Sequence, residues 1–134
     1  MSMDQTVLEA KRIGVYSCKL ACTLGEAVRH MVDEDISALV VVDQEGCLAG
    51  IITRTDLLRA LLKAGNWEVE AVEKYMNPDV VTVPPEARLS FVAELLLEKH
   101  IHRVVVVREE EQGKRRPIAV VSSTDLVYHM INEV

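Results

Sequence analysis

The sequence lacks the marks of several protein classes. Three cysteines among 134 residues are too few and odd in number for a disulfide framework, which favours a reducing cytoplasm. No apolar run approaches the length of a membrane-spanning helix, and the N-terminus has no signal-peptide pattern. Basic residues are outnumbered, so the net charge of −6 argues against binding to nucleic acid or an anionic membrane. We therefore expect a cytoplasmic protein that binds neither.

Catalytic motifs are also missing. There is no Gly-x-x-x-x-Gly-Lys phosphate loop, no Gly-x-Ser-x-Gly elbow and no His-Glu-x-x-His helix. His100 and His102 have the spacing of one strand face, but no third metal ligand accompanies them. Asp56 and Asp125 belong to separate halves of the chain and do not form an evident acid–base pair. These absences predict a protein that is not an enzyme and has no metal site and no obligatory cofactor.

The chain does contain an internal repeat. Residues 36–42 align with residues 101–107, 65 positions later. Thr53-Arg54-Thr55-Asp56 aligns with Ser122-Ser123-Thr124-Asp125, 69 positions later. The second copy therefore carries four extra residues between Val107 and Ile118, in a charged stretch that predicts a longer hairpin loop.

Hydrophobic periodicity and helix-start signals predict the same order of elements in each half: strand, helix, strand, strand, helix. In the first half the expected strands are 15–18, 38–42 and 47–52, and the expected helices are one from Thr23 and one over 54–63. In the second half the expected strands are 80–83, 103–107 and 118–121, and the expected helices are one introduced by Pro84-Pro85 and one over 124–131. A leading helix over 4–11 and a short helix over 67–73 are also expected. The fold class is α+β. Residues 1–65 hold the leading helix and first repeat, 66–75 the connector, and 76–134 the second repeat.

These features resemble a known family. The segment from Tyr75 to Val83, the two hairpins and the Thr/Ser-x-x-Asp endings are similar to a tandem pair of CBS domains, named after cystathionine beta-synthase. The resemblance covers about Ile13 to Met130. Ile13-Gly14-Val15-Tyr16, Ile36-Ser37-Ala38 and Ile101-His102-Arg103 also resemble segments of the gamma subunit of AMP-activated protein kinase. The resemblance implies two β-α-β-β-α repeats packed as a pseudo-two-fold pair, a Bateman module, with adenine nucleotide bound in the cleft between them.

Carried over to this chain, the resemblance implies a stronger site. Asp125 would accept hydrogen bonds from the ribose hydroxyls, and His102 and Arg103 would bind the phosphate, for which the planar guanidinium is well suited. Hydroxyl groups at the helix start would also donate to the phosphate, and apolar side chains would flank the adenine. The full set is Val15, Ile36, Ser37, His102, Arg103, Val120, Ser122, Thr124 and Asp125.

The resemblance implies a second, weaker site around Asp56. Its equivalents of His102 and Arg103 are Ser37 and Ala38, which carry no charge. We therefore expect weaker phosphate binding there, or none. The residues of this site are Thr53, Arg54, Asp56, Val80 and Ile101.

Other interpretations stay open at this point. A hydroxyl residue three positions before an acid is also a helix cap. The chain departs from the family pattern at Ala119, usually a glycine, and at Arg108, where an aspartate often stands. The regulatory ligand could be AMP, ADP, ATP, S-adenosylmethionine or NAD. A homodimer through the helices and an unidentified regulated protein are the expected partners. The competing hypothesis is a structural interaction module whose ligand sites are vestigial.

Overall fold

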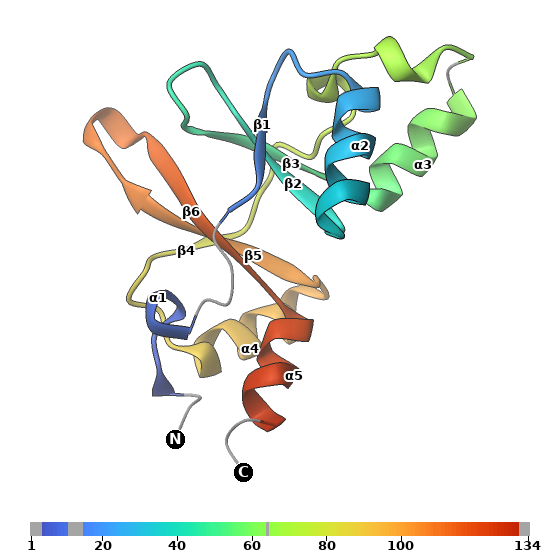
Figure 1. Cartoon of the computed structure of the whole chain (residues 1–134). Coiled ribbons are helices and arrows are strands. Elements are labelled where there is room, and N and C mark those ends of the chain that lie inside the picture. Colours follow the sequence, from blue (N-terminus) through green and yellow to red (C-terminus); the bar gives the residue numbers. More distant parts are fainter. Residues whose placement is uncertain (1–3, 11–14, 64, 132–134) are drawn as a thin grey trace. The chain divides into compact units, whose positions relative to one another are not determined.

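The computed structural model describes residues 4–10, 15–63 and 65–131. These residues form two three-stranded sheets and their helices (Figure 1). The elements, with 3-10 helices labelled η, are α1 Val7–Ala10, β1 Ser17–Lys19, α2 Leu24–Glu34, β2 Ala38–Val42, β3 Leu48–Thr53, α3 Arg54–Lys63, η2 Trp67–Val69, η3 Val72–Lys74, β4 Thr82–Val83, α4 Leu89–Lys99, β5 Arg103–Glu109, η4 Glu111–Gly113, β6 Arg115–Ser122 and α5 Ser123–Ile131. The α+β class and the repeated order of elements are confirmed.

The chain divides into two compact units that do not follow chain order. Residues 16–80 form one unit, called here the N-repeat unit. Residues 81–134 form the other together with residues 1–15, and this is called the C-repeat unit. The leading helix α1, which precedes the first repeat in sequence, therefore packs within the unit of the second repeat.

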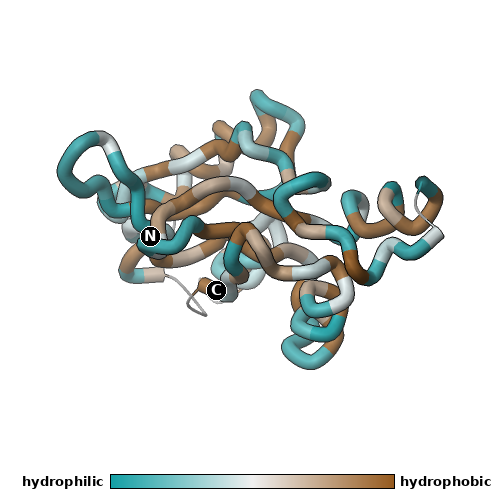
Figure 2. Tube along the Cα trace, turned by 90° about the horizontal axis from the view of Figure 1, so that it is seen from above, coloured by the Kyte–Doolittle hydropathy of each residue, from teal (hydrophilic) through white to brown (hydrophobic). Residues whose placement is uncertain are grey.

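The two sheets share one pairing scheme. In the N-repeat unit β2 pairs parallel with β1 and antiparallel with β3, and in the C-repeat unit β5 pairs in the same way with β4 and β6. The register of each hairpin shifts at equivalent places, between Val41 and Val42 and between Val106 and Val107. The valine-rich central strands are buried, as expected of strands paired on both sides. Figure 2 shows the brown, hydrophobic stretches of chain separated by teal, hydrophilic loops.

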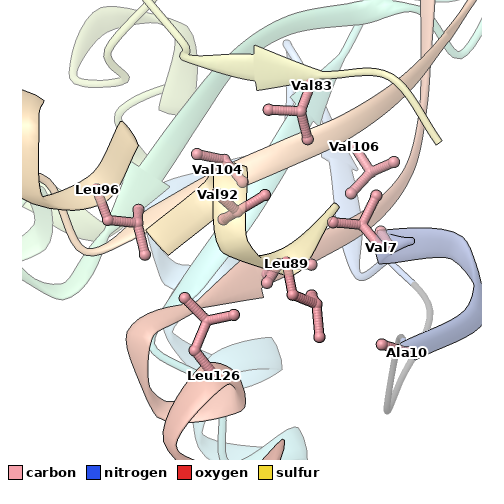
Figure 3. Close-up of a cluster of buried hydrophobic side chains, with 11 residues drawn as sticks. Val7, Ala10, Val83, Leu89, Val92, Leu96, Val104, Val106 and Leu126 are labelled. Carbon is pink, nitrogen blue, oxygen red and sulfur yellow. The ribbon is translucent and has the colours of Figure 1, made fainter. Parts of the chain in front are cut away.

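The leader and the connector play the same structural role in their units. In the C-repeat unit the Val7 amide donates to the Ala87 carbonyl at 2.8 Å, and the Leu89 amide donates to the Gln5 carbonyl at 3.0 Å. Both Val7 and Leu89 are fully buried, in the cluster drawn in Figure 3. The leader thus supplies part of the core beneath α4.

The N-repeat unit has the same arrangement, in which each residue is 65 positions from its equivalent in the C-repeat unit. The Val72 amide donates to the Cys22 carbonyl at 2.8 Å, and the Leu24 amide donates to the Glu70 carbonyl at 2.8 Å. Val72 is fully buried and packs in the cluster that contains Leu24. Each repeat is therefore completed by a segment that lies outside its own strand–helix order.

Several local predictions are confirmed, and one is wrong. Thr23 and Glu26 form a capping box at the start of α2, as predicted. The charged stretch after Val107 is not one long loop, because β5 continues to Glu109 and β6 begins at Arg115. Cross-strand pairs such as Arg108–Arg116 and Glu109–Arg115 lengthen the ladder, so the extra residues extend the hairpin itself. Lys11, Ile13 and Gly14, which earlier predictions included, lie outside the described residues.

Gly50 is held against Met76 and Asn77, which directly follow the connector. The backbones of Ile51 and Asn77 exchange two hydrogen bonds, of 3.0 and 2.8 Å. A Cβ atom on Gly50 would lie 2.6 Å from Sδ of Met76 and 2.9 Å from the carbonyl oxygen of Asn77. Both distances are shorter than a carbon contact allows, and the carbonyl is fixed by the bridge. The matching position in the C-repeat unit is Ala119, where a Cβ is accommodated in a buried site.

We predict that Gly50→Ala destabilises the protein by about 1–3 kcal/mol, because overpacking forces the backbone apart. The measurement is equilibrium urea denaturation. Gly65→Ala is the control, since a Cβ there has no neighbour within 4 Å. Equal stability of the two variants would show that Met76 and Asn77 move away from the added Cβ atom at little cost.

Candidate functional site

The first candidate motif lies where β3 passes directly into α3. Thr53 is the last residue of β3, and Asp56 lies in the first turn of α3. The Thr53 amide and hydroxyl donate to Oδ2 of Asp56 at 2.8 and 3.0 Å. Asp56 is only 8% exposed, and it is the one buried charged residue among the residues described. Its negative charge is stabilised by these donors and by the positive end of the helix dipole.

A third residue completes this motif. Nη1 of Arg59 donates to Oδ1 of Asp56 at 3.2 Å, so both carboxylate oxygens have protein donors. The sequence reasoning named Arg54 as the cation of this site and missed Arg59. The signal was the spacing of three between Asp56 and Arg59, which places both on one helix face. Arg54 also lines a groove between α2 and α3.

The second motif has the same local geometry at the junction of β6 and α5. The Ser122 amide and hydroxyl donate to Oδ2 of Asp125 at 2.8 and 3.0 Å. Asp125 is half-buried rather than buried. Tyr128 occupies the position that Arg59 has in the first repeat. The repeated carboxylates therefore differ in exposure and in the side chain one turn further along.

This reciprocal bonding is not unique to the two motifs. Glu26 bonds the amide and hydroxyl of Thr23 at 3.1 and 3.0 Å in the box that caps α2. Hydrogen bonds from the Thr23 amide and hydroxyl lower the pKa of exposed Glu26. Box geometry alone therefore identifies a helix cap. Asp56 and Asp125 differ from Glu26 because each lies at a direct strand-to-helix junction, beside the start of the neighbouring strand.

The predicted phosphate-binding residues lie beside the Asp125 motif. Arg103, the first residue of β5, is the cross-strand partner of Ser122. The Ser123 amide donates to the His102 carbonyl at 2.9 Å. Arg103 is half-buried and His102 is exposed. The structure thus brings the His102-Arg103 pair and the start of α5 together within one unit.

The N-repeat unit has the same junction without the charges. Ala38 is the cross-strand partner of Thr53, and the Arg54 amide donates to the Ser37 carbonyl at 3.2 Å. Three positions before β2 and β5 lie Asp35 and His100, which both have left-handed backbone conformations, with φ of 52° and 54°. The chain therefore turns in the same way into both strand starts, while only the second carries an arginine there.

The remaining predicted residues are distributed over both units. Six of these predicted residues are half-buried. The C-repeat unit holds Val15, Ile101 and Val120, and the N-repeat unit holds Ile36, Ser37 and Val80. Thr124 is exposed in the first turn of α5. The predicted stronger site therefore takes residues from both units.

A separate groove of about 520 Å³ lies within the N-repeat unit, between α2 and α3. Its lining is mainly apolar and follows helical spacing on both helices, with one aromatic side chain from η2. The lining residues are Val28, Met31, Val32, Asp35, Ile36, Arg54, Leu57, Leu58, Leu61 and Trp67. This groove was not among the features predicted from the sequence.

Two other features are absent from residues 4–10, 15–63 and 65–131. Within these ranges no three His, Cys, Asp or Glu side chains are grouped as metal ligands. Over the same ranges, every helix is too short or too polar to cross a membrane.

The chain is similar to a known protein family and to known proteins. The model of the CBS domain family matches residues 10–63 and 72–132. Uncharacterized protein MJ1225 of Methanocaldococcus jannaschii is 27% identical over 126 residues, 94% of this chain. Those residues are 43% of that protein, so the chain spans less than half of this relative.

Two solved structures have the same fold. The CBS domain pair of protein MJ0100, in complex with 5'-methylthioadenosine and S-adenosyl-L-methionine, superposes with a TM-score of 0.83 at 24% identity, covering 97% of this chain and 98% of that chain. CBSX2 in complex with AMP superposes with a TM-score of 0.79 at 22% identity, covering 96% and 98%. At these identities the likeness concerns the fold alone.

We predict that Ser122→Ala lowers the free energy of unfolding by about 1 kcal/mol, because the cap of α5 loses its hydroxyl. Ser123→Ala, one position later and exposed, changes it by less than about 0.5 kcal/mol. Thermal unfolding followed by circular dichroism measures both. A larger effect at Ser123 would contradict the capping geometry.

Proposed function

Because the chain belongs to the CBS domain family, as a tandem pair of CBS repeats, we propose that it is a regulatory module that binds an adenine nucleotide. The observation that carries this proposal is the junction of β5, β6 and α5. There Arg103 stands across from Ser122, beside a helix start that carries Asp125. Amides at a helix start and a guanidinium together form a favourable environment for a phosphate.

In the proposed stronger site, Asp125 accepts hydrogen bonds from the ribose hydroxyls. Thr124 donates to the phosphate, and Ser122 does so once its hydroxyl proton turns away from Asp125. His102 and Arg103 add donors and positive charge. Val15, Ile36 and Val120 flank the adenine, with Ser37 nearby. This assignment takes Val15 and Val120 from the C-repeat unit and Ile36 and Ser37 from the N-repeat unit.

The proposed weaker site centres on Asp56 and Thr53, with Arg54, Val80 and Ile101. Ala38 stands where the stronger site has Arg103, so the phosphate meets less positive charge there. We propose that this site binds nucleotide weakly or stays empty.

The proposed ligands are AMP, ADP and ATP, and the module reports the energy state of the cell. The complex of CBSX2 with AMP supports a nucleoside monophosphate, and the complex of MJ0100 supports S-adenosylmethionine as the alternative. NAD is a further alternative that shares the adenosine group. All of them present a ribose to Asp125, so the aspartate alone does not select among them.

Regulation by this module requires no reaction step and no obligatory cofactor. A ligand shifts a protein between conformations only through its different affinity for each. Helices α3 and α5 start at the two motifs, so ligand binding at either motif can alter the helix that leads away from it. We propose that the altered helices act on a second copy or on a regulated partner protein in the cytoplasm.

We propose the groove between α2 and α3 as the surface for a second copy of the chain. Exposed apolar side chains line it, including Val32, Leu58 and Leu61. Asp35 and Arg54, also in its lining, have opposite charges. In a two-fold dimer the same patch meets itself, so each charge can lie beside its opposite in the partner.

The competing proposal is a structural interaction module with vestigial ligand sites. It is supported by the capping bonds between Asp125 and Ser122, which give Asp125 a structural role at the start of α5 without any ligand. The two proposals differ in one observable, since only the regulatory module is stabilised thermally by an adenosine ligand.

We predict that Asp125→Ala lowers AMP affinity roughly tenfold to 150-fold, the effect of losing hydrogen bonds to a charged group. Calorimetric titration measures the affinity. Asp56→Ala, the matching change in the first repeat, should leave the tighter binding event nearly unchanged. Asp125→Asn keeps the shape of the side chain and removes its charge. A loss of AMP affinity in this variant too would show that unfolding alone does not explain the effect of Asp125→Ala. Wild-type affinity in Asp125→Ala would refute the ribose role.

We predict that Leu61→Glu converts a wild-type dimer into a monomer, because it places a charge in the apolar groove. Leu62→Glu, at an 88% exposed position outside the groove lining, should remain dimeric. Sedimentation velocity distinguishes the two. A monomeric wild type, or dissociation by both changes alike, would contradict an interface at this groove.

A further inference from the structure

The ion pair between Arg59 and Asp56 bears directly on the difference between the two repeats. Oδ2 of Asp56 accepts from the Thr53 amide and hydroxyl, and Oδ1 accepts from Nη1 of Arg59 at 3.2 Å. The Asp56 side chain is 11% exposed, whereas the Arg59 side chain is 64% exposed. The arginine therefore reaches from solvent and binds the carboxylate oxygen that the helix cap leaves available.

A ribose needs that same oxygen. Its two hydroxyl groups donate to a carboxylate, and the cap of α3 already occupies Oδ2. A ribose at Asp56 must therefore share Oδ1 with Arg59 or displace the guanidinium. Because little of the Asp56 side chain is exposed, there is little room for both donors.

The second repeat has a different residue at this position. Asp56 and Asp125 are 69 positions apart, and Arg59 and Tyr128 are separated by the same number. Tyr128 is 42% exposed and carries a phenol, which brings no positive charge to the carboxylate. The chain thus encodes a guanidinium in one repeat and a neutral ring in the other, three residues after the same motif.

From these contacts we infer that Arg59 is a specificity-determining residue, which keeps ribose from Asp56 and so makes the first repeat the weaker site. The inference rests on the proposed function, because it assigns ribose binding to the Thr/Ser-x-x-Asp motif. This cause of the asymmetry is separate from the lack of a positively charged side chain at Ala38 that could bind the phosphate. Arg59 acts by donating a hydrogen bond to Oδ1 of Asp56, the oxygen that the ribose would need.

The test is an NMR titration of isotope-labelled protein with adenosine. Adenosine carries the ribose without a phosphate, so removing a positive charge does not weaken its binding electrostatically. The amide signals of Thr53 and Asp56 report the first repeat, and those of Ser122 and Asp125 report the second. One variant is Arg59→Tyr, which introduces the residue found at this position in the second repeat. The other is Arg59→Gln, which removes the charge without an aromatic ring that could pack badly in the first repeat.

We expect both Arg59 variants to tighten adenosine binding at the first repeat by about two- to fivefold, the range set by loss of an exposed ion pair. Binding at the second repeat should not change. Lys63→Gln is the matched control, because it removes one positive charge from the same helix, and it should leave both repeats unchanged. Tyr128→Arg should weaken binding at the second repeat.

Unchanged or weaker binding at the first repeat in both Arg59 variants, with the second repeat still binding, would overturn the role of Arg59 and leave the proposed function standing. An equal gain in Lys63→Gln would overturn it as well, since the effect would then be general electrostatics. Absence of adenosine binding in every protein would overturn the proposed function and this inference together.

Discussion

The structure depends on one junction, in which the start of a central strand is hydrogen-bonded to the start of the helix that follows the hairpin. The carbonyl of Ser37 accepts from the Arg54 amide, and the carbonyl of His102 accepts from the Ser123 amide. An acid three residues beyond the last strand residue then closes the first turn of the helix. Because strand and helix starts are tied in this way, the residues at the start of the central strand are held beside the first turn of the helix, where side chains and the helix dipole can act together.

The same constraint explains why the two repeats can differ without changing the fold. The junction is made by backbone groups, a hydroxyl and a carboxylate, so the neighbouring positions are free to vary. Arg103 replaces Ala38 on the strand, and Tyr128 replaces Arg59 on the helix, with the pairing register preserved. Each repeat also depends on a segment beyond its own elements, the leader under α4 and the connector under α2, which keep equivalent backbone bonds.

Much of the local structure could be predicted from the sequence because it depends on local signals. The capping box at Thr23, the strand from Ala38 to Val42 and the helix from Arg54 to Lys63 follow from spacing within a few residues. The length of the second hairpin was not predicted, because charged residues on a two-stranded extension resemble a loop. Arg59 was missed because an exposed arginine on a helix is usually only solvated. The membership of the leader in the C-repeat unit depends on contacts more than 70 positions apart, such as Val7 with Ala87, which no local pattern encodes.

We propose that the chain is an adenine-nucleotide module with unequal sites. Calorimetric titration of the unmodified protein with AMP gives affinity and stoichiometry together. We expect saturable binding near one AMP per chain at the tighter site. No heat of binding with AMP, supported by an unchanged melting temperature, would contradict nucleotide recognition, and two equal sites per chain would contradict the asymmetry.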